Sequence, residues 1–226
     1  MMLNDKIFFT HLPKCGGSFM LKLLNNNGYH DTKGGAGHKN YESSSTIVDF
    51  NNVLAFGLVR NPWDWYVSLY RYCITRKSLG FGGVLFRKSS NNYKNNFNDY
   101  MRSLLNDFGA KDMFDGQNMG LFNVSNRRDL GLFTLQYIYH FYGVKYISNE
   151  VEELPDSKFI IGKLEEIDTF IPNLFNTHNL PLTYNIKTKI NVSDRDSDYR
   201  KYYEDDVIEL VREKDKLIID KFNYEF

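Results

Sequence analysis

The sequence lacks the features that mark several large classes of protein. Its 226 residues include two cysteines, Cys15 and Cys73, so no disulfide framework is predicted. Lys plus Arg and Asp plus Glu number 28 each, and this balance argues against a field that attracts nucleic acid or a membrane surface. No apolar run approaches the ~20 residues that span a bilayer, and residues 1–6 do not resemble a signal peptide. These absences favour a soluble cytoplasmic protein in which local clusters carry any anion recognition.

Aromatic residues, in contrast, are plentiful. With 18 Phe and 16 Tyr, the chain can bury one sizeable core. No linker or internal repeat divides it, so we expect a single domain over residues 1–226. The stretch from Ser78 to Asn98 is rich in Gly, Ser and Asn, which predicts a loop or lid inside an insert around residues 76–126.

Apolar runs alternate with helical patterns along the chain. Residues 7–9, 53–59 and 158–162 read as buried strands, and the unbroken apolar run 53–59 is typical of a strand buried on both faces, as in a parallel sheet covered by helices. Helical patterns follow at residues 19–24, 62–74, 99–108, 130–142, 165–175 and 199–222, and a weak helix or turn is expected after the serine-rich run 42–46. The alternation predicts an α/β fold with a mostly parallel central sheet flanked by helices.

The link between the first strand and the first helix has the composition of an anion site. Gly16 and Gly17 allow a sharp turn and a close approach of backbone N–H groups to a ligand. Ser18 is expected to cap the helix, whose amino end favours a negative charge. Lys14 adds a mobile positive charge, although its place before the glycines does not match a Walker A loop. The loop therefore suits a phosphate-like group.

A second motif follows the second strand. Arg60 ends that strand, Pro62 lies near the start of the next helix, and Ser68 lies two helical turns further on. Because neighbouring parallel strands end at the same edge of a sheet, we expect Arg60 to lie near the Lys14 loop. The alternative is that Arg60 only pairs with Asp64 and that Ser68 is an ordinary helical residue.

Together, the two motifs resemble those of the sulfotransferases that use 3′-phosphoadenosine 5′-phosphosulfate (PAPS). His11-Leu12-Pro13-Lys14-Cys15-Gly16-Gly17-Ser18 is similar to the 5′-phosphosulfate loop of this family, and Arg60-Asn61-Pro62 with Ser68 is similar to its 3′-phosphate motif. Ile161–Glu165 and parts of the tail after Asn191 resemble the carbohydrate-type and bacterial branch. The resemblance implies a P-loop-like three-layer sandwich, PAPS as donor, 3′,5′-phosphoadenosine (PAP) as product, and no metal.

The resemblance also implies roles for individual residues. Lys14 is expected to stabilise the charge on the leaving oxygen, and Arg60 and Ser68 to hold the 3′-phosphate. The expected nucleotide-binding residues are Lys14, Cys15, Gly16, Gly17, Ser18, Phe19, Arg60, Ser68 and Arg195. A reactive-thiol role for Cys15 is the less favoured alternative, because no histidine–acid pair accompanies it.

His38, in a glycine-rich loop between the motifs, is the expected general base for the acceptor hydroxyl. His11 and Glu42 are the alternatives. Trp63, Trp65 and Tyr66 are expected in the core, with Trp63 the most suited of the three to contact a ligand. The predicted reaction moves a sulfuryl group to a hydroxyl of a glycan-like or other small alcohol. An ATP-dependent P-loop phosphotransferase and a non-catalytic nucleotide-binding protein are the competing interpretations.

Overall fold

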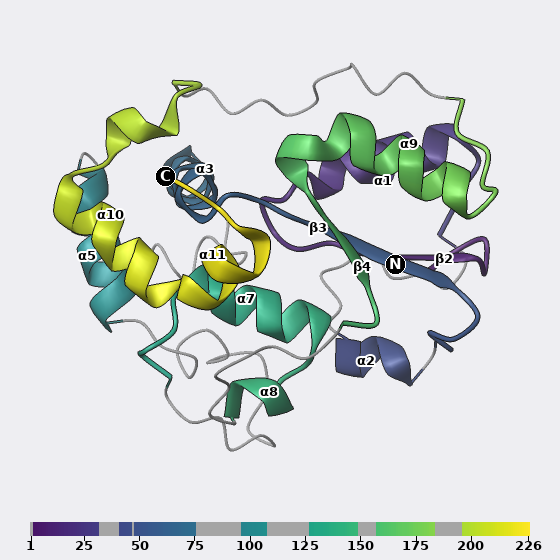
Figure 1. Cartoon of the computed structure of the whole chain (residues 1–226), viewed down its shortest axis with the longest axis horizontal. Coiled ribbons are helices and arrows are strands. Elements are labelled where there is room, and N and C mark those ends of the chain that lie inside the picture. Colours follow the sequence, from purple (N-terminus) through teal and green to yellow (C-terminus); the bar gives the residue numbers. More distant parts are fainter. Residues whose placement is uncertain are drawn as a thin grey trace. The chain divides into compact units, whose positions relative to one another are not determined.

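The structure is a computed structural model (Figure 1). It describes residues 2–31, 41–46, 48–75, 96–107, 127–148, 157–183 and 196–226. The contacts divide the chain into two compact units. The sheet unit comprises Met1–Arg60, Tyr139–Gly143 and Pro155–Val192, and the helical unit comprises Asn61–Ile138, Val144–Leu154 and Ser193–Phe226. The single domain over residues 1–226 stays a prediction.

The sheet unit is built on four strands in the order β1-β2-β3-β4. β1 (Met2–Leu3) pairs antiparallel with β2 (Ile7–Thr10), whereas β2, β3 (Leu54–Val59) and β4 (Ile160–Lys163) are parallel. β2 and β3 are buried along their whole length, as their unbroken apolar runs predict. The predicted α/β fold with a mostly parallel sheet is therefore confirmed.

Helices cover both faces of this sheet. Figure 1 shows α1 (Gly17–Asn26) and α9 (Ile167–Thr177) on one face and α2 (Tyr41–Ser45) on the other. On the first face, Phe175 of α9 packs edge-on against Phe56 of β3, with ring centroids 6.2 Å apart. This arrangement gives the sheet unit the three layers of the predicted sandwich.

The opposite face is packed with aromatic rings. Phe8 of β2 meets Phe50 at 5.1 Å and Phe159 at 6.0 Å between ring centroids. The ring of Phe141 lies so close to Gly57 of β3 that a Cβ at position 57 would overlap it. A glycine in the middle of a buried strand thus makes room for the aromatic side chain of Phe141, which belongs to the sheet unit.

The strand after residue 157 differs from its prediction. The run 158–162 predicts a buried strand, but β4 begins at Ile160, which is 42% exposed. β4 is the last strand in the order of the described sheet, so it has a strand neighbour on one side only. A short apolar run does not distinguish an edge strand from a central one, so the exposure of Ile160 could not be predicted from the sequence pattern.

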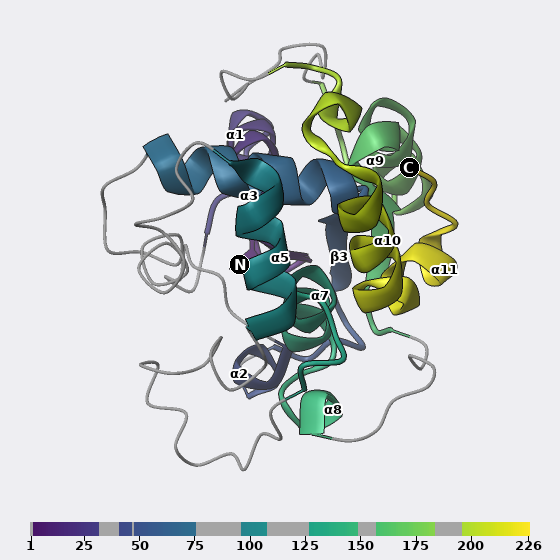
Figure 2. The same ribbon diagram turned by 90° about the vertical axis from the view of Figure 1, so that its left-hand side faces the viewer.

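The helical unit contains seven helices within the described residues, seen from a second direction in Figure 2. α5 and α10 pack against each other, and η2 packs against α3. The helices are α3 (Pro62–Thr75), α5 (Phe97–Asp107), α7 (Leu132–Phe141, whose last residues belong to the sheet unit), α8 (Lys145–Ser148), η2 (Tyr199–Tyr202), α10 (Asp205–Lys214) and α11 (Lys216–Phe222).

A buried carboxylate at the junction of α10 and α11 ties these two helices to α3 and α7. Asp215, between α10 and α11, has no exposed surface. It accepts hydrogen bonds from the Tyr66 hydroxyl at 2.7 Å, the Thr134 hydroxyl at 2.7 Å and the Thr134 backbone N–H at 2.8 Å. Burial raises the pKa of Asp215 from 3.8 to about 6, against the lowering effect of these hydrogen bonds. A Cβ at Gly131 would overlap the carboxylate, so that glycine lets Asp215 reach the start of α7.

Two smaller predictions are sharpened by the structure. The serine-rich run forms the short helix α2, and the expected turn follows it, where the Asn52 N–H donates to the Asp49 carbonyl at 3.1 Å. Trp63 has no exposed surface, and its indole N–H donates to the Ile208 carbonyl at 3.2 Å. Trp63 is therefore a core residue like Trp65 and Tyr66, as expected for all three, and it has no exposed surface to offer a ligand.

Candidate functional site

The backbone of the loop between β2 and α1 reverses direction at two residues with left-handed conformations. Lys14 has φ 63° and Gly16 has φ 75°. The turn is closed by the Cys15 N–H, which donates to the Leu12 carbonyl at 3.3 Å. Left-handed and right-handed residues in succession direct neighbouring backbone N–H groups toward one point, which creates a concavity for anions.

Gly17 is required by a close approach. The ring of His11 lies against its Cα, and a Cβ at position 17 would overlap the imidazole. His11 in turn stacks on Phe9 of β2, with centroids 6.3 Å apart and planes 18° apart. The stacked imidazole therefore supports the loop from beneath, and only glycine leaves space for it.

The first turn of α1 faces the same loop. Gly16 is the N-cap residue, no side chain caps the helix, and the Met20 N–H donates to the Gly16 carbonyl at 3.0 Å. The amides of Gly17, Ser18 and Phe19 precede that first helical bond and have no acceptor within the helix. Ser18 lies inside the first turn with an exposed side chain, so the prediction that it caps the helix is wrong. Its exposure keeps the hydroxyl accessible from solvent.

Arg60 lies where the parallel sheet predicts it. Its Nη1 donates to the Lys14 carbonyl at 3.2 Å, which brings the second motif to the first loop. The register continues to β4, because Val59 pairs with Lys163. The next residue, Leu164, packs against Gly16, where a Cβ would come within 2.6 Å of Leu164 Cδ1. The carboxyl ends of three parallel strands therefore surround the loop.

Asn61 fixes the start of α3, a role that the sequence motif alone does not reveal. Its Oδ1 accepts hydrogen bonds from the N–H groups of Trp63 at 3.1 Å and Asp64 at 3.4 Å, which caps α3. Its Nδ2 donates to the Glu225 carbonyl at 2.7 Å. An Asn followed by Pro at a helix start is a local signal for the cap, whereas no local signal points to Glu225. Ser68, the second residue of the motif that begins with Arg60, lies on the same helix and is buried, with 5% of its surface exposed.

The remaining predicted site residues are either outside the described structure or placed in surroundings that bear on their expected roles. His38 and Arg195 lie outside the described residues. Of the alternative bases, His11 is held between Phe9 and Gly17, and Glu42 lies against Gly143, where a Cβ would come within 2.6 Å of its carboxylate. The Cys15 thiol is buried, which disfavours the reactive-thiol alternative because reactive cysteines are partly exposed.

The sequence matches the model of the sulfotransferase family over residues 2–130, a range that contains the Lys14 loop, Arg60 and Ser68. The chain belongs to the sulfotransferase family. No curated protein and no solved structure matches the sequence. Within the described residues of this sulfotransferase, no helix is long and apolar enough to cross a membrane, and no group of three His, Cys, Asp or Glu side chains is arranged to hold a metal ion.

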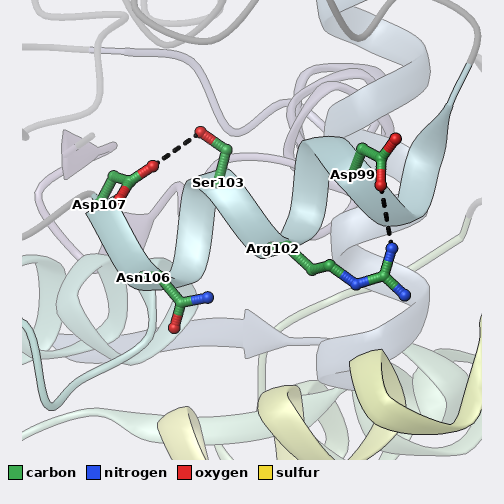
Figure 3. A pocket seen from close by; sticks show the side chains of 5 residues that line it. All are labelled: Asp99, Arg102, Ser103, Asn106 and Asp107. Atoms are coloured by element: carbon green, nitrogen blue, oxygen red, sulfur yellow. Dashed lines mark hydrogen bonds and ion pairs between the residues drawn. The ribbon is translucent and has the colours of Figure 1, made fainter.

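A surface hollow of the sulfotransferase lies elsewhere, on α5 (Figure 3). Arg102, one of the residues that line the hollow, donates to Asp99 at 3.0 Å, Asp206 at 2.8 Å and Glu204 at 2.5 Å. These acceptors raise the pKa of the guanidinium. The ion pairs connect α5 to the start of α10, so Arg102 has a structural role and the hollow is not the candidate site. Its lining residues are Asp99, Arg102, Ser103, Asn106 and Asp107.

Proposed function

We propose that this sulfotransferase transfers a sulfuryl group from PAPS to a hydroxyl of a glycan-like or other small alcohol. The observation that carries the proposal is the hydrogen bond from the Arg60 guanidinium to the Lys14 carbonyl. It joins a cationic residue that suits one phosphate to a loop that suits another. A nucleotide with phosphate groups at both its 3′ and 5′ positions has two anionic ends for such a pair of sites.

The loop fits the 5′ end of that nucleotide. The left-handed residues Lys14 and Gly16 and the open first turn of α1 supply N–H groups for an anion. We assign the 5′-phosphate to the amides of Gly17, Ser18 and Phe19 and to the side chain of Ser18. Cys15 contributes backbone to the turn, because its side chain is buried.

Arg60 and Ser68 are assigned to the 3′-phosphate. A guanidinium contacts two phosphate oxygens at once in a planar arrangement, which a lysine does not reproduce. Arg195 is assigned a further contact to the 3′-phosphate or the adenosine. These assignments follow the spacing of the family motif from Arg60 to Ser68.

The chemistry assigned to the chain is charge stabilisation and proton removal. PAPS supplies the activated sulfuryl group and the phosphate that leaves. The Lys14 ammonium and the loop amides stabilise negative charge on the bridging oxygen of that phosphate, as donors aimed at developing charge do. His38 accepts the proton of the attacking hydroxyl, with His11 and Glu42 as the alternatives. No step assigned here needs a metal ion, and we assign acceptor selection to residues 76–126.

Ligand binding separates this proposal from its competitors. A ligand present at about 100 times its dissociation constant stabilises a protein by about 2.7 kcal/mol, so thermal unfolding with PAP and with ATP plus magnesium is a direct comparison. We expect a clear rise in melting temperature with PAP. A rise with ATP and magnesium but not with PAP would favour a phosphotransferase and refute the proposal.

Turnover is the second part of the test. We expect transfer of label from 35S-PAPS to at least one member of a panel of sugars, glycans and simple alcohols. PAP binding without sulfation of any hydroxyl compound would favour a non-catalytic nucleotide-binding protein.

A further inference from the structure

The segment Asn223–Phe226 reaches the start of α3 within the helical unit. The backbone carbonyl of Glu225 accepts a hydrogen bond from Asn61 Nδ2 at 2.7 Å. The other end of the same amide, Asn61 Oδ1, caps α3 through Trp63 and Asp64. The orientation of the Asn61 side chain is therefore fixed from both ends, and one of those ends depends on Glu225.

The ring of Phe226 anchors this segment. It packs edge-on against Trp63 at 5.6 Å, Tyr203 at 5.5 Å and Tyr199 at 5.9 Å, measured between ring centroids. The Arg200 guanidinium lies 5.9 Å from its centroid. Trp63 belongs to the first turn of α3, so Phe226 contacts the same turn that Asn61 caps.

A further bond ties this aromatic cluster to the first turn. The Tyr203 hydroxyl donates to the Trp63 carbonyl at 2.8 Å. The indole of Trp63 is fixed in turn by its hydrogen bond to Ile208 of α10. The first turn of α3 is thus held by residues that follow it by more than a hundred positions in the chain.

We propose that Phe226 and the Glu225 carbonyl form a positioning tether for α3 that is needed for recognition of the 3′-phosphate. The inference rests on the proposed function, because it takes Arg60 and Ser68 as the 3′-phosphate residues. Asn61 follows Arg60 directly, and Ser68 lies two turns beyond Asn61 on the helix that the tether holds. Phe226 and Asn61 are positioning residues here, not phosphate ligands.

The tether predicts a selective loss of affinity. Without the Phe226 ring, the Glu225 carbonyl loses its fixed place and the Asn61 amide loses one of its two attachments. The start of α3, which directly follows Arg60 and leads to Ser68 two turns on, is then held less accurately, while the amides of the 5′ loop belong to a different helix. Binding of a nucleotide with a 3′-phosphate should weaken, and binding of a nucleotide without one should not.

Two variants test the tether independently. Phe226→Ala removes the anchor, and Asn61→Ser keeps a capping oxygen while removing the amide that donates to Glu225. Phe222→Ala is the matched control, because Phe222 is also a half-buried Phe near the same end of the sequence, yet it packs on Tyr137 and Tyr224. The measurements are the dissociation constants of PAP and of adenosine 5′-phosphate (AMP), by titration calorimetry.

We expect Phe226→Ala and Asn61→Ser each to weaken PAP binding about tenfold, the change that accompanies loss of one hydrogen bond to a charged phosphate. AMP binding should stay the same, and the double variant should lose no more than either single one, since both act through one tether. Phe222→Ala should retain the wild-type preference for PAP over AMP.

Three results would overturn the inference alone: an equal loss of PAP and AMP affinity, an unchanged preference in both tether variants, or the same selective loss in Phe222→Ala. Wild-type protein that does not bind PAP would instead overturn the proposed function, and the inference with it. If Phe226→Ala fails to fold, Phe226→Leu and Asn61→Ser supply the same comparison.

Discussion

The buried carboxylate of Asp215 should make stability fall as the pH rises through the mildly acidic range. Its pKa is raised from 3.8 to about 6 in the folded protein. The folded state therefore binds more protons than the unfolded chain between these pH values. The contribution of Asp215 to stability is fully present below about pH 3.8 and is lost as the pH rises to about 6. The difference in pKa corresponds to about 3 kcal/mol.

Asp215→Asn removes the titration and keeps a hydrogen-bonding group at each position, with the direction of the bond to Tyr66 reversed. The amide oxygen can accept from the Thr134 N–H and hydroxyl, and the amide nitrogen can donate to the Tyr66 hydroxyl. We therefore expect the variant to fold and to lack this component of the pH dependence. Relative to the variant, the wild type should lose about 3 kcal/mol of unfolding free energy across the interval, with a slope of about 1.4 kcal/mol per pH unit.

Urea unfolding followed by circular dichroism from pH 3.5 to pH 8 measures this difference. The comparison with the variant is essential because other carboxylates act in the opposite direction. Ion pairs and hydrogen bonds lower the pKa values of Asp129, Asp196 and Asp206, so their contributions are lost as the pH falls. A difference between wild type and variant that stays flat, or that favours the wild type increasingly as the pH rises, would refute the reasoning.

Four further predictions concern the candidate site. Lys14→Ala should lower turnover by about 10²–10³-fold, the usual effect of losing one donor aimed at developing charge, with a smaller change in PAP affinity by calorimetry; unchanged turnover would remove Lys14 from catalysis. Arg60→Ala should weaken PAP binding and leave AMP binding unchanged, and equal losses would contradict its assignment to the 3′-phosphate. His38→Ala should keep PAP affinity and abolish label transfer from 35S-PAPS; retained transfer would identify another base. Gly17→Ala should destabilise the protein by about 1–3 kcal/mol through overpacking against His11, as measured by urea unfolding, and His11→Ala in the same chain should recover part of the loss.

Local patterns predicted the framework of this protein well. The apolar runs before Thr10 and Arg60 located β2 and β3, and Pro62 marked the start of α3. The rule that parallel strands end at one edge placed Arg60 beside Lys14, and the hydrogen bond between them confirms that step.

Features that depend on distant residues were missed. Nothing near Asn61 in the sequence indicates that its amide binds Glu225. Nothing near Asp215 indicates a buried carboxylate, since it lies in a charged, helical stretch like any solvated one. Ser18 has the composition of a cap, yet Gly16 takes that position because the loop enters the helix in a left-handed conformation. Tertiary structure decided the first two points, and the local backbone conformation of the loop decided the third.

The order of the strands also has a consequence for how the protein is made. β3 pairs with β2, which precedes it in the sequence, but its other neighbour, β4, is synthesised only after the whole chain between them has been made. At about 5–20 residues per second, the edge of Leu54–Val59 that later pairs with β4 stays without that strand for several seconds. In a nascent chain, the exposed edge of β3 is therefore a site for aggregation or chaperone binding until β4 has left the ribosome.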